Sequence, residues 1–419
     1  MYNFEAFSKE DRELMLSKIG VKSMDEIFNS MGEKALLKSF DMDLGHNEIQ
    51  AQKRLKNLSN MNKTNYSCFL GAGARFRYVP SLIQDIASRF EFLSCYTPYQ
   101  AEISQGTLEV MYEFQSLMCT LVNQDVSNAS VYDGATAAAE AILMAARLTK
   151  KNKVFIDENI NPNYIEVIKT YLWAQNIEYE ISNGSNSDEL CAKIYQTPNR
   201  YGEFMEMPSK NNKELIISIV DLVSLALYEP PKSDITVGDI QSLGIGLNFG
   251  GAYAGFIACQ DKYKRQLCGR IAGKTKDKNG KVAYCLTLQA REQHIRREKA
   301  TSNICSNQAL VAFCANLYLR KLGKTGFLKI AQESTNNAHY LAQKLQELGF
   351  EVKNKDFFDE FCVNVGNSEK FLAFMKEKNI LAGVKLNSSE ILVSVSELNS
   401  IDELENYIEE AKKLSLIRI

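Results

Sequence analysis

The chain has 419 residues, of which 45% are hydrophobic, and this is enough for one large globular domain with a smaller one attached. Its 49 basic and 51 acidic residues leave a formal charge of -2, spread along the chain, which excludes the basic footprint of a nucleic-acid-binding protein. The ten cysteines never form a pair with a two-residue gap and the three histidines stand alone, so we expect buried thiols in a reducing compartment and no metal site.

Residues 1–65 are predicted to form a helical arm. Ser8 and Ser23 each precede acidic residues in a pattern typical of a helix start. The N-terminus lacks the basic and then apolar order of a signal peptide, and no uncharged apolar run is long enough to span a bilayer. We therefore expect a cytoplasmic protein without a membrane segment.

Residues 66–322 are predicted to form a large α/β domain. A glycine-rich turn at 71–74 precedes helices expected at 81–92 and 108–121. The β-prone runs that follow alternate with helices, which indicates a mostly parallel sheet covered on both faces. These runs lie at 128–132, 154–156, 177–181, 215–220 and 255–259.

The remaining residues, 323–419, are predicted to form a small α+β domain with the order helix, two strands, helix, two strands, helix. A long helix is expected to begin after Asn307 and to run past Leu319. The stretch 182–188 is rich in serine, asparagine and glycine and is predicted to be a surface loop.

A turn of small residues opens the helix that follows the first β-prone run. It consists of Asp133, Gly134, Ala135 and Thr136. Backbone N–H groups at a helix N-terminus suit a phosphate, but the same residues also suit a plain helix cap. Both interpretations remain open from the local sequence.

Asp221 directly follows the apolar run 215–220, where a carboxylate at the edge of a parallel sheet commonly faces a ligand crevice. In pyridoxal-phosphate enzymes of the aspartate aminotransferase type, an aspartate so placed pairs with the pyridine nitrogen, and a later lysine forms the Schiff base. No lysine lies between Lys232 and Lys262. The chain has the outline of such a site without its nucleophile, so we assign no catalytic residue and expect no decarboxylation by this chain alone.

The densest charge run of the sequence contains five groups that can be cationic within 291–299. They are Arg291, His294, Arg296, Arg297 and Lys299. Such a run can hold an anion or pair across a subunit interface, and it can equally be a solvated helix face. His294 taken alone is more typical of a structural hydrogen-bonding group than of a catalyst.

Two long segments, 96–106 and 288–305, resemble signatures of subunit 1 of the two-subunit bacterial glycine dehydrogenases (decarboxylating). Weaker similarities lie at 132–137, 196–202, 241–244 and 395–397, so that the resemblance covers nearly the whole chain. Within the two signatures, the candidates for a partner interface or an active-site crevice are Tyr96, Tyr99, Gln105, Arg291, His294, Arg296, Arg297, Thr301, Ser302 and Asn303.

The resemblance implies a pyridoxal-phosphate-dependent transferase fold of the aspartate aminotransferase type, called fold type I. It also implies an αβ pair, dimerised as α2β2, in which glycine dehydrogenase subunit 2 carries the lysine and the pyridoxal phosphate. The complex would decarboxylate glycine and pass the aminomethyl group to the lipoyl group of the small H-protein. This subunit would complete the complex and wall the crevice, and Asp133, Gly134, Ala135, Thr136 and Asp221 would be remnants of a degenerate cofactor site.

One loop departs from the family pattern. A tyrosine and a histidine usually stand before the proline that follows the glycine-rich turn, whereas this chain has Arg75 and Arg77 before Pro80. Two other functions remain as alternatives: a non-catalytic scaffold or regulatory subunit of the same fold, and an independent pyridoxal-phosphate enzyme that uses a lysine from elsewhere, such as Lys232 or Lys262.

Overall fold

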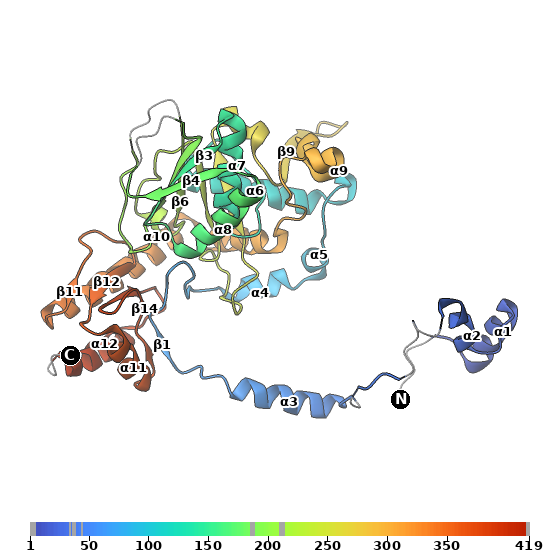
Figure 1. The fold of residues 1–419 in the computed structure, drawn as a ribbon, viewed down its shortest axis with the longest axis horizontal. Coiled ribbons are helices and arrows are strands. Elements are labelled where there is room, and N and C mark those ends of the chain that lie inside the picture. The colour runs from blue at the N-terminus through green and yellow to red at the C-terminus, as the bar shows by residue number, and fades with distance from the viewer. Residues whose placement is uncertain are drawn as a thin grey trace. The chain divides into compact units, whose positions relative to one another are not determined.

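The computed structural model describes residues 6–32, 35, 39–42, 45–184, 189–208 and 214–415. The chain divides into two compact units, Met1–Thr64 and Asn65–Ile419, which are treated separately (Figure 1). Residues 185–188 of the loop predicted at 182–188 lie outside the described ranges. In the described part of the chain, no helix is both long and apolar enough to cross a membrane.

The described residues of the first unit form several short helices. Its elements are α1 (Lys9–Ile19), α2 (Met24–Phe28), the 3-10 turn η1 (Asn29–Met31) and α3 (Glu48–Asn60). The predicted helix starts are confirmed, because the Ser8 and Ser23 side chains accept hydrogen bonds from backbone N–H groups three residues later. None of the described residues in α1, α2 and α3 is buried, so their apolar side chains have no core of their own.

The second unit is built on a seven-stranded mixed sheet with the strand order β2-β8-β7-β6-β5-β3-β4. Strands β3 to β7 run parallel, whereas β8 is antiparallel to β7 and β2 is antiparallel to β8. The strands are β2 (Val126–Ser127), β3 (Lys153–Asp157), β4 (Glu178–Ser182), β5 (Ala192–Thr197), β6 (Leu215–Val220), β7 (Ile235–Asp239) and β8 (Gly255–Cys259).

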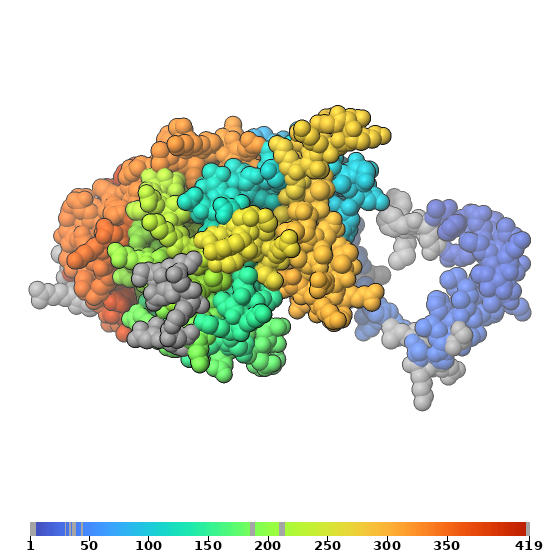
Figure 2. Space-filling view, turned by 90° about the horizontal axis from the view of Figure 1, so that it is seen from above, coloured from blue at the N-terminus to red at the C-terminus, as the bar shows by residue number. Residues whose placement is uncertain are grey.

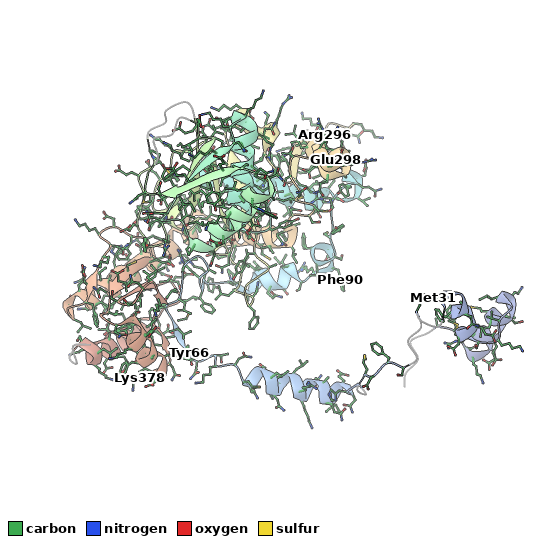
Figure 3. All side chains as sticks on the ribbon, in the orientation of Figure 1. Met31, Tyr66, Phe90, Arg296, Glu298 and Lys378 are labelled. Carbon is green, nitrogen blue, oxygen red and sulfur yellow. The ribbon has the colours of Figure 1, made fainter. Side chains whose placement is uncertain are left out.

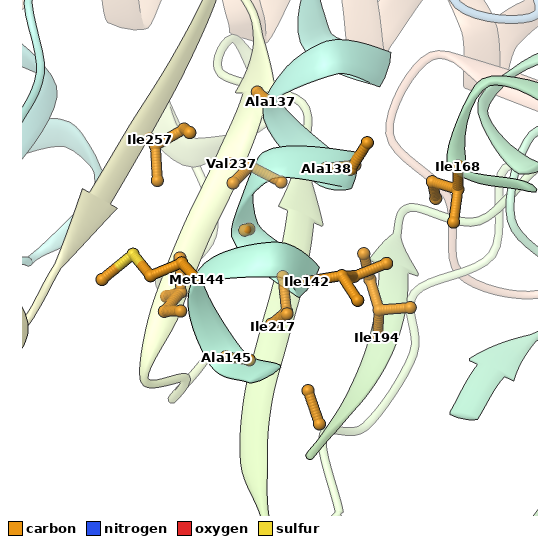
Figure 4. Close-up of a cluster of buried hydrophobic side chains, with 14 of the residues drawn as sticks. Ala137, Ala138, Ile142, Met144, Ala145, Ile168, Ile194, Ile217, Val237 and Ile257 are labelled. Carbon is orange, nitrogen blue, oxygen red and sulfur yellow. The ribbon is translucent and has the colours of Figure 1, made fainter. Parts of the chain in front are cut away.

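Helices cover both faces of this sheet. On one face α7 (Gly134–Thr149) and α8 (Pro162–Ala174) pack against inward side chains such as Ile217 and Ile257. The alanines of α7 bring its backbone close to the strands, as Figure 4 shows. The opposite face is covered by α4 (Ser81–Ala87), α6 (Gln105–Val122) and the first part of α10 (Ala309–Glu347). The fold class predicted from the sequence is confirmed at this level.

Two local predictions in this unit are wrong. The run 128–132 forms no strand, because Ser130 has a positive φ of 100° and only Val131 makes an isolated bridge, to Gly255. The helix predicted over 81–92 is two helices, α4 and α5 (Phe90–Leu93). The chain becomes extended at Arg89, whose ψ is 142°.

The C-terminal part of the second unit has its own core. Its elements are β11 (Glu351–Val352), β12 (Glu360–Asn364), α11 (Ser368–Glu377), β13 (Ile380–Leu381), β14 (Val384–Lys385), β15 (Glu390–Ser394) and α12 (Ile401–Ser415). A four-stranded antiparallel sheet has the order β11-β12-β15-β14. The extra strand β13 pairs instead with β1 (Ser67–Cys68), so three strands stand where two were predicted. The domain boundary predicted between residues 322 and 323 coincides with Gly323, which interrupts α10 with a φ of 58°. The division into two domains at this point stays a prediction.

A hairpin and several short helical turns complete the unit. The hairpin of β9 (Ile271–Lys276) and β10 (Val282–Thr287) projects from the body in Figure 2. The turns are η3 (Ala101–Ile103), η4 (Ser224–Ala226), η5 (Asp261–Gln266), η6 (Gln289–Arg291), α9 (Gln293–Arg296) and η7 (Arg297–Lys299).

Candidate functional site

The carboxyl ends of the parallel strands surround a small polar cavity of about 60 Å³. Asp221 follows the last residue of β6 and Asp239 is the last residue of β7, so two carboxylates meet at this edge. The cavity is lined by Gly73, Arg75, Asn161, Tyr164, Gln196, Pro198, Ile219, Val220, Asp221, Asp239, Gln241 and Ser242.

Asp221 lies at the predicted edge but is already engaged within the chain. Arg75 Nη1 donates to Asp221 Oδ2 at 2.8 Å, and the Ser224 backbone N–H donates to Asp221 Oδ1 at 2.8 Å. Arg75 is held there by Gln241, whose Oε1 accepts from Arg75 N–H at 3.0 Å and whose Nε2 donates to Arg75 C=O at 2.9 Å. The sequence showed Arg75 only as a departure from the family pattern, and gave no sign of this ion pair.

The N-terminus of α7 is also occupied by carboxylates of the chain. Asp133 is the N-cap, and its Oδ1 accepts from Thr136 N–H at 2.7 Å. Asp239 Oδ2 accepts from Gly134 N–H at 2.9 Å and its Oδ1 accepts from Gln241 N–H at 2.8 Å. Burial raises the pKa of Asp239 to about 6, with the nearby Asp133 acting in the same direction. Ala135 is buried in the same turn.

These residues do not fit pyridoxal phosphate. None of the cavity-lining residues is a lysine, and the sequence has none from 233 through 261. Asp221, which the resemblance would set against the cofactor ring, is paired with Arg75, and carboxylates stand where phosphate oxygens would accept hydrogen bonds. The cavity is also far below the roughly 300 to 1,000 Å³ usual for a cofactor or substrate pocket.

Lys232 and Lys262 lie at the opposite edge of the sheet. Lys232 lines a cavity of about 730 Å³ beside the first residues of β6 and β7, and Lys262 follows the antiparallel strand β8 in η5. Both lysines are therefore at the amino-terminal edge of the parallel strands, away from Asp221. This placement argues against an independent active site that combines either lysine with Asp221.

The cationic run divides into an inward and an outward part. Arg291 donates from Nη2 to Gly269 C=O and from Nε to Leu288 C=O, both at 3.1 Å, and burial lowers its pKa. The other cationic groups of the run are exposed, and Figure 3 shows Arg296 on the outside of α9. The exposed members are His294, Arg296, Arg297 and Lys299.

The segment after this run is tied to the body of the same unit. Thr301 N–H donates to Arg291 C=O at 2.9 Å, and Asn303 Oδ1 accepts from Gln293 Nε2 at 3.5 Å. Ser302 Oγ donates to Glu140 Oε1 at 2.6 Å, and burial raises the pKa of Glu140. Ser302 is thus occupied by a contact that the sequence did not indicate.

The first family signature meets the second in space. The rings of Tyr99 and His294 pack edge to face at 5.1 Å, and Arg270 Nη2 donates to the Tyr99 hydroxyl at 3.3 Å. Tyr96 remains 77% exposed, and its hydroxyl lies 3.3 Å from Ser306 Oγ. Gln105 bonds both backbone groups of Tyr284 and so holds the start of α6 to the β9–β10 hairpin.

The described part of the chain holds no group of three or more histidine, cysteine, aspartate or glutamate side chains placed for a metal ion. The site is therefore organised by carboxylates and guanidinium groups. It pairs charges and orders the segments around the carboxyl edge, and none of the residues lining its cavity is a lysine.

The fold is shared with a class of enzymes. A C-DES mutant with glycine covalently linked to the PLP cofactor superposes with a TM-score of 0.58 at 11% identity, over 83% of this chain and 97% of that chain. A Thermus thermophilus aspartate aminotransferase superposes with a TM-score of 0.56 at 11% identity, over 84% and 99%. The chain has the fold of the pyridoxal-phosphate-dependent enzymes of fold type I.

Closer similarities identify the family. A solved glycine decarboxylase (P-protein) of the glycine cleavage system, in inhibitor-bound form, superposes with a TM-score of 0.92 at 32% identity, over 99% of this chain and 100% of that chain. The family model "Glycine cleavage system P-protein" matches residues 4–410. The chain belongs to the glycine cleavage system P-protein family.

Two relatives within this family carry the name "Probable glycine dehydrogenase (decarboxylating) subunit 1". That of Carboxydothermus hydrogenoformans is 40% identical over 94% of this chain and 96% of its own length. That of Thermotoga maritima is 40% identical over 98% of this chain and 100% of its own length. The resemblance read from the two signatures is confirmed.

Proposed function

We propose that this chain is the subunit of a cytoplasmic, heteromeric glycine decarboxylase that does not itself hold the cofactor. A second, lysine-bearing subunit binds pyridoxal phosphate, which supplies the electron sink for the decarboxylation of glycine. The complex, of α2β2 composition, passes the aminomethyl group to the lipoyl group of H-protein. This chain completes the complex and walls the active-site crevice.

One observation supports the placement of the cofactor on the partner subunit. At the carboxyl edge, where a fold type I enzyme would hold its cofactor, the cavity of this chain has no lysine and Asp221 is paired with Arg75. The names of the relatives, which call each a subunit 1, support a second subunit that supplies what this chain lacks.

Exposed apolar side chains support a partner at the first signature. Phe90, Tyr96 and Ile103 are 82%, 77% and 81% exposed. Phe90 lies just before this signature. Exposed large apolar side chains favour a protein–protein interface, because water contact with them is unfavourable. We assign this surface and the exposed Arg296 and Arg297 to the contact with the lysine-bearing subunit.

The test is co-expression with that subunit, followed by an assay of glycine and bicarbonate exchange in the presence of lipoylated H-protein. We expect exchange by the complex and none by either subunit alone. A complex without exchange activity would favour the non-catalytic scaffold, and exchange by this chain alone would overturn the proposal. Omitting H-protein serves as the control for the aminomethyl acceptor.

A further inference from the structure

Residues 67–80, called here the strap, run from the C-terminal sheet to the carboxyl edge of the large sheet. At one end β1 pairs with β13, and the Ser394 N–H donates to Phe69 C=O at 3.0 Å. In the middle, Asn161 Nδ2 donates to Ala72 C=O at 2.8 Å. At the other end the strap leads into α4. The strap therefore contacts the C-terminal sheet at β15 and, through Asn161, the start of α8.

Two arginines on the strap pair with carboxylates from both parts of the unit, the large α/β part and the C-terminal part. Arg75 Nη1 lies 2.8 Å from Asp221 Oδ2 and 3.1 Å from Asp359 Oδ1, and its Nη2 lies 2.8 Å from Glu360 Oε2. Arg77 pairs with Asp359 and lies 2.8 Å from Glu397 Oε2. The two arginine side chains are 10% and 0% exposed, so these pairs are shielded from water.

The position of Arg75 is more informative than its burial. Its guanidinium faces Asp221 from the cavity side, where the ring of a bound cofactor would present its own cation to this aspartate in a fold type I enzyme. The guanidinium carries a fixed positive charge at any pH at which the protein is folded. It therefore gives Asp221 the counter-charge that the carboxylate needs in a buried place.

We propose that Arg75 is a built-in substitute for the cofactor cation: it neutralises Asp221, closes the pocket of this chain and fastens the C-terminal part to the carboxyl edge. The inference deepens the proposed function and rests on it, because it explains how this chain remains ordered when the cofactor resides on its partner. Arg75 is accordingly a positioning residue and not a catalytic one.

The charges of the cluster support this role. Two guanidinium groups face four carboxylates, those of Asp221, Asp359, Glu360 and Glu397. Burial raises the pKa of Asp359 to about 6, although Arg75 and Arg77 act to lower it. Negative charge is thus already in excess, so loss of the Arg75 cation leaves buried carboxylates without a partner.

The test is a rescue experiment on the full chain, read out by thermal unfolding at neutral pH. Arg75→Ala should lower Tm by about 4 to 7 °C, as expected for removing one partner of a buried pair in a unit of this size. Asp221→Asn in the Arg75→Ala background should restore about half of the loss or more, because it removes the carboxylate left unpaired. Added methylguanidinium should raise the Tm of Arg75→Ala and leave that of the wild type unchanged.

Glu397→Gln in the Arg75→Ala background is the matched control. Glu397 belongs to the same cluster but contacts Arg77, Ser334 and the Tyr78 N–H, not Arg75. We expect it to restore nothing. Equal restoration by Asp221→Asn and Glu397→Gln, or no restoration by either, would overturn the proposal.

If Arg75→Ala does not fold, Arg75→Lys keeps the charge and tests the same point. A lysine that retains most of the wild-type Tm supports charge substitution, and one that loses as much as alanine opposes it. These outcomes are independent of the exchange assay, because they concern the isolated chain. A failed exchange assay would therefore contradict the proposed function without contradicting the role of Arg75. A failed rescue would contradict the role of Arg75 without contradicting the proposed function.

Discussion

Asp239 ends β7 with a carboxylate that accepts two backbone hydrogen bonds and faces a second carboxylate, Asp133. The folded chain holds a proton on Asp239 up to a pH of about 6, whereas the ordinary pKa of 3.8 applies after unfolding. Between these values the folded state binds more protons than the unfolded state. The contribution of Asp239 to stability is therefore lost as the pH rises through this window.

Asp239→Asn imitates the protonated side chain and should remove this dependence. From about pH 4 to about pH 7, the free energy of unfolding of the wild type should fall relative to that of Asp239→Asn by up to about 3 kcal/mol. Urea unfolding of both proteins at several pH values measures the difference. Parallel pH profiles would show that Asp239 titrates normally in the folded chain.

The strap depends on close backbone contact at Gly71. A Cβ atom there would lie 2.0 Å from Glu360 Oε1 and 2.5 Å from Ser394 Cβ. Glu360 also accepts from Ala72 N–H at 2.8 Å, so a displaced carboxylate weakens the attachment of the strap at two points. Only glycine leaves room for this arrangement.

Gly71→Ala is therefore expected to destabilise the chain by about 1 to 3 kcal/mol, the usual cost of overpacking a buried site. Gly106→Ala is the matched control, because a Cβ atom at Gly106, in the first turn of α6, meets nothing within 4 Å. Chemical denaturation of the two variants decides the point. Equal stabilities would mean that the strap shifts without cost.

The exposed part of the cationic run lies on α9 and η7, where Arg296 and Arg297 contact no acidic side chain within the described residues. Crowded like charges repel one another, and exposure to water relieves this only in part. An interface with an acidic surface of the partner subunit would relieve it further. The interface role predicted from the sequence stays a prediction.

Replacing Arg296 and Arg297 by alanine should weaken assembly with the lysine-bearing subunit, or exchange by the complex, tenfold or more, which corresponds to about 1.4 kcal/mol. Lys324→Ala with Lys329→Ala on α10 removes two exposed charges elsewhere and should leave both unchanged. Titration of the subunits by calorimetry measures assembly. If the affinity of assembly and the exchange activity of the α9 variant are unchanged, the cationic run is a solvated helix face.

At the scale of the whole molecule, the small cavity at the carboxyl edge predicts that the purified chain carries no covalently bound pyridoxal phosphate. The cavity has no lysine and a volume of only about 60 Å³. We expect no absorbance near about 420 nm, where an internal aldimine absorbs, and no change on treatment with borohydride. The partner subunit prepared in the same way is the positive control. A reducible band on the isolated chain would contradict the prediction.

Much of the architecture could be predicted because local patterns determine it. Apart from Ser218, the runs 215–220 and 255–259 are apolar, as is typical of buried strands, and Ser8 and Ser23 cap helices through contacts only three residues away. Strand β5 was missed because Lys193, Tyr195 and Gln196 interrupt its apolar pattern. Strand β7 was missed because Thr236, Gly238 and Asp239 interrupt its pattern in the same way.

The sequence alone determined the family and the lysine-free stretch from 233 through 261, because both are properties of residue order. Only the tertiary structure decided what stands at the site instead. Arg75 meets Asp221 and Glu360 across 146 and 285 residues of sequence, and Asp239 reaches the Gly134 N–H across 105. Such contacts leave no local pattern in the sequence, since they form only when the strap packs against the carboxyl edge in the folded chain. Burial there strengthens the attraction between the charges that are brought together.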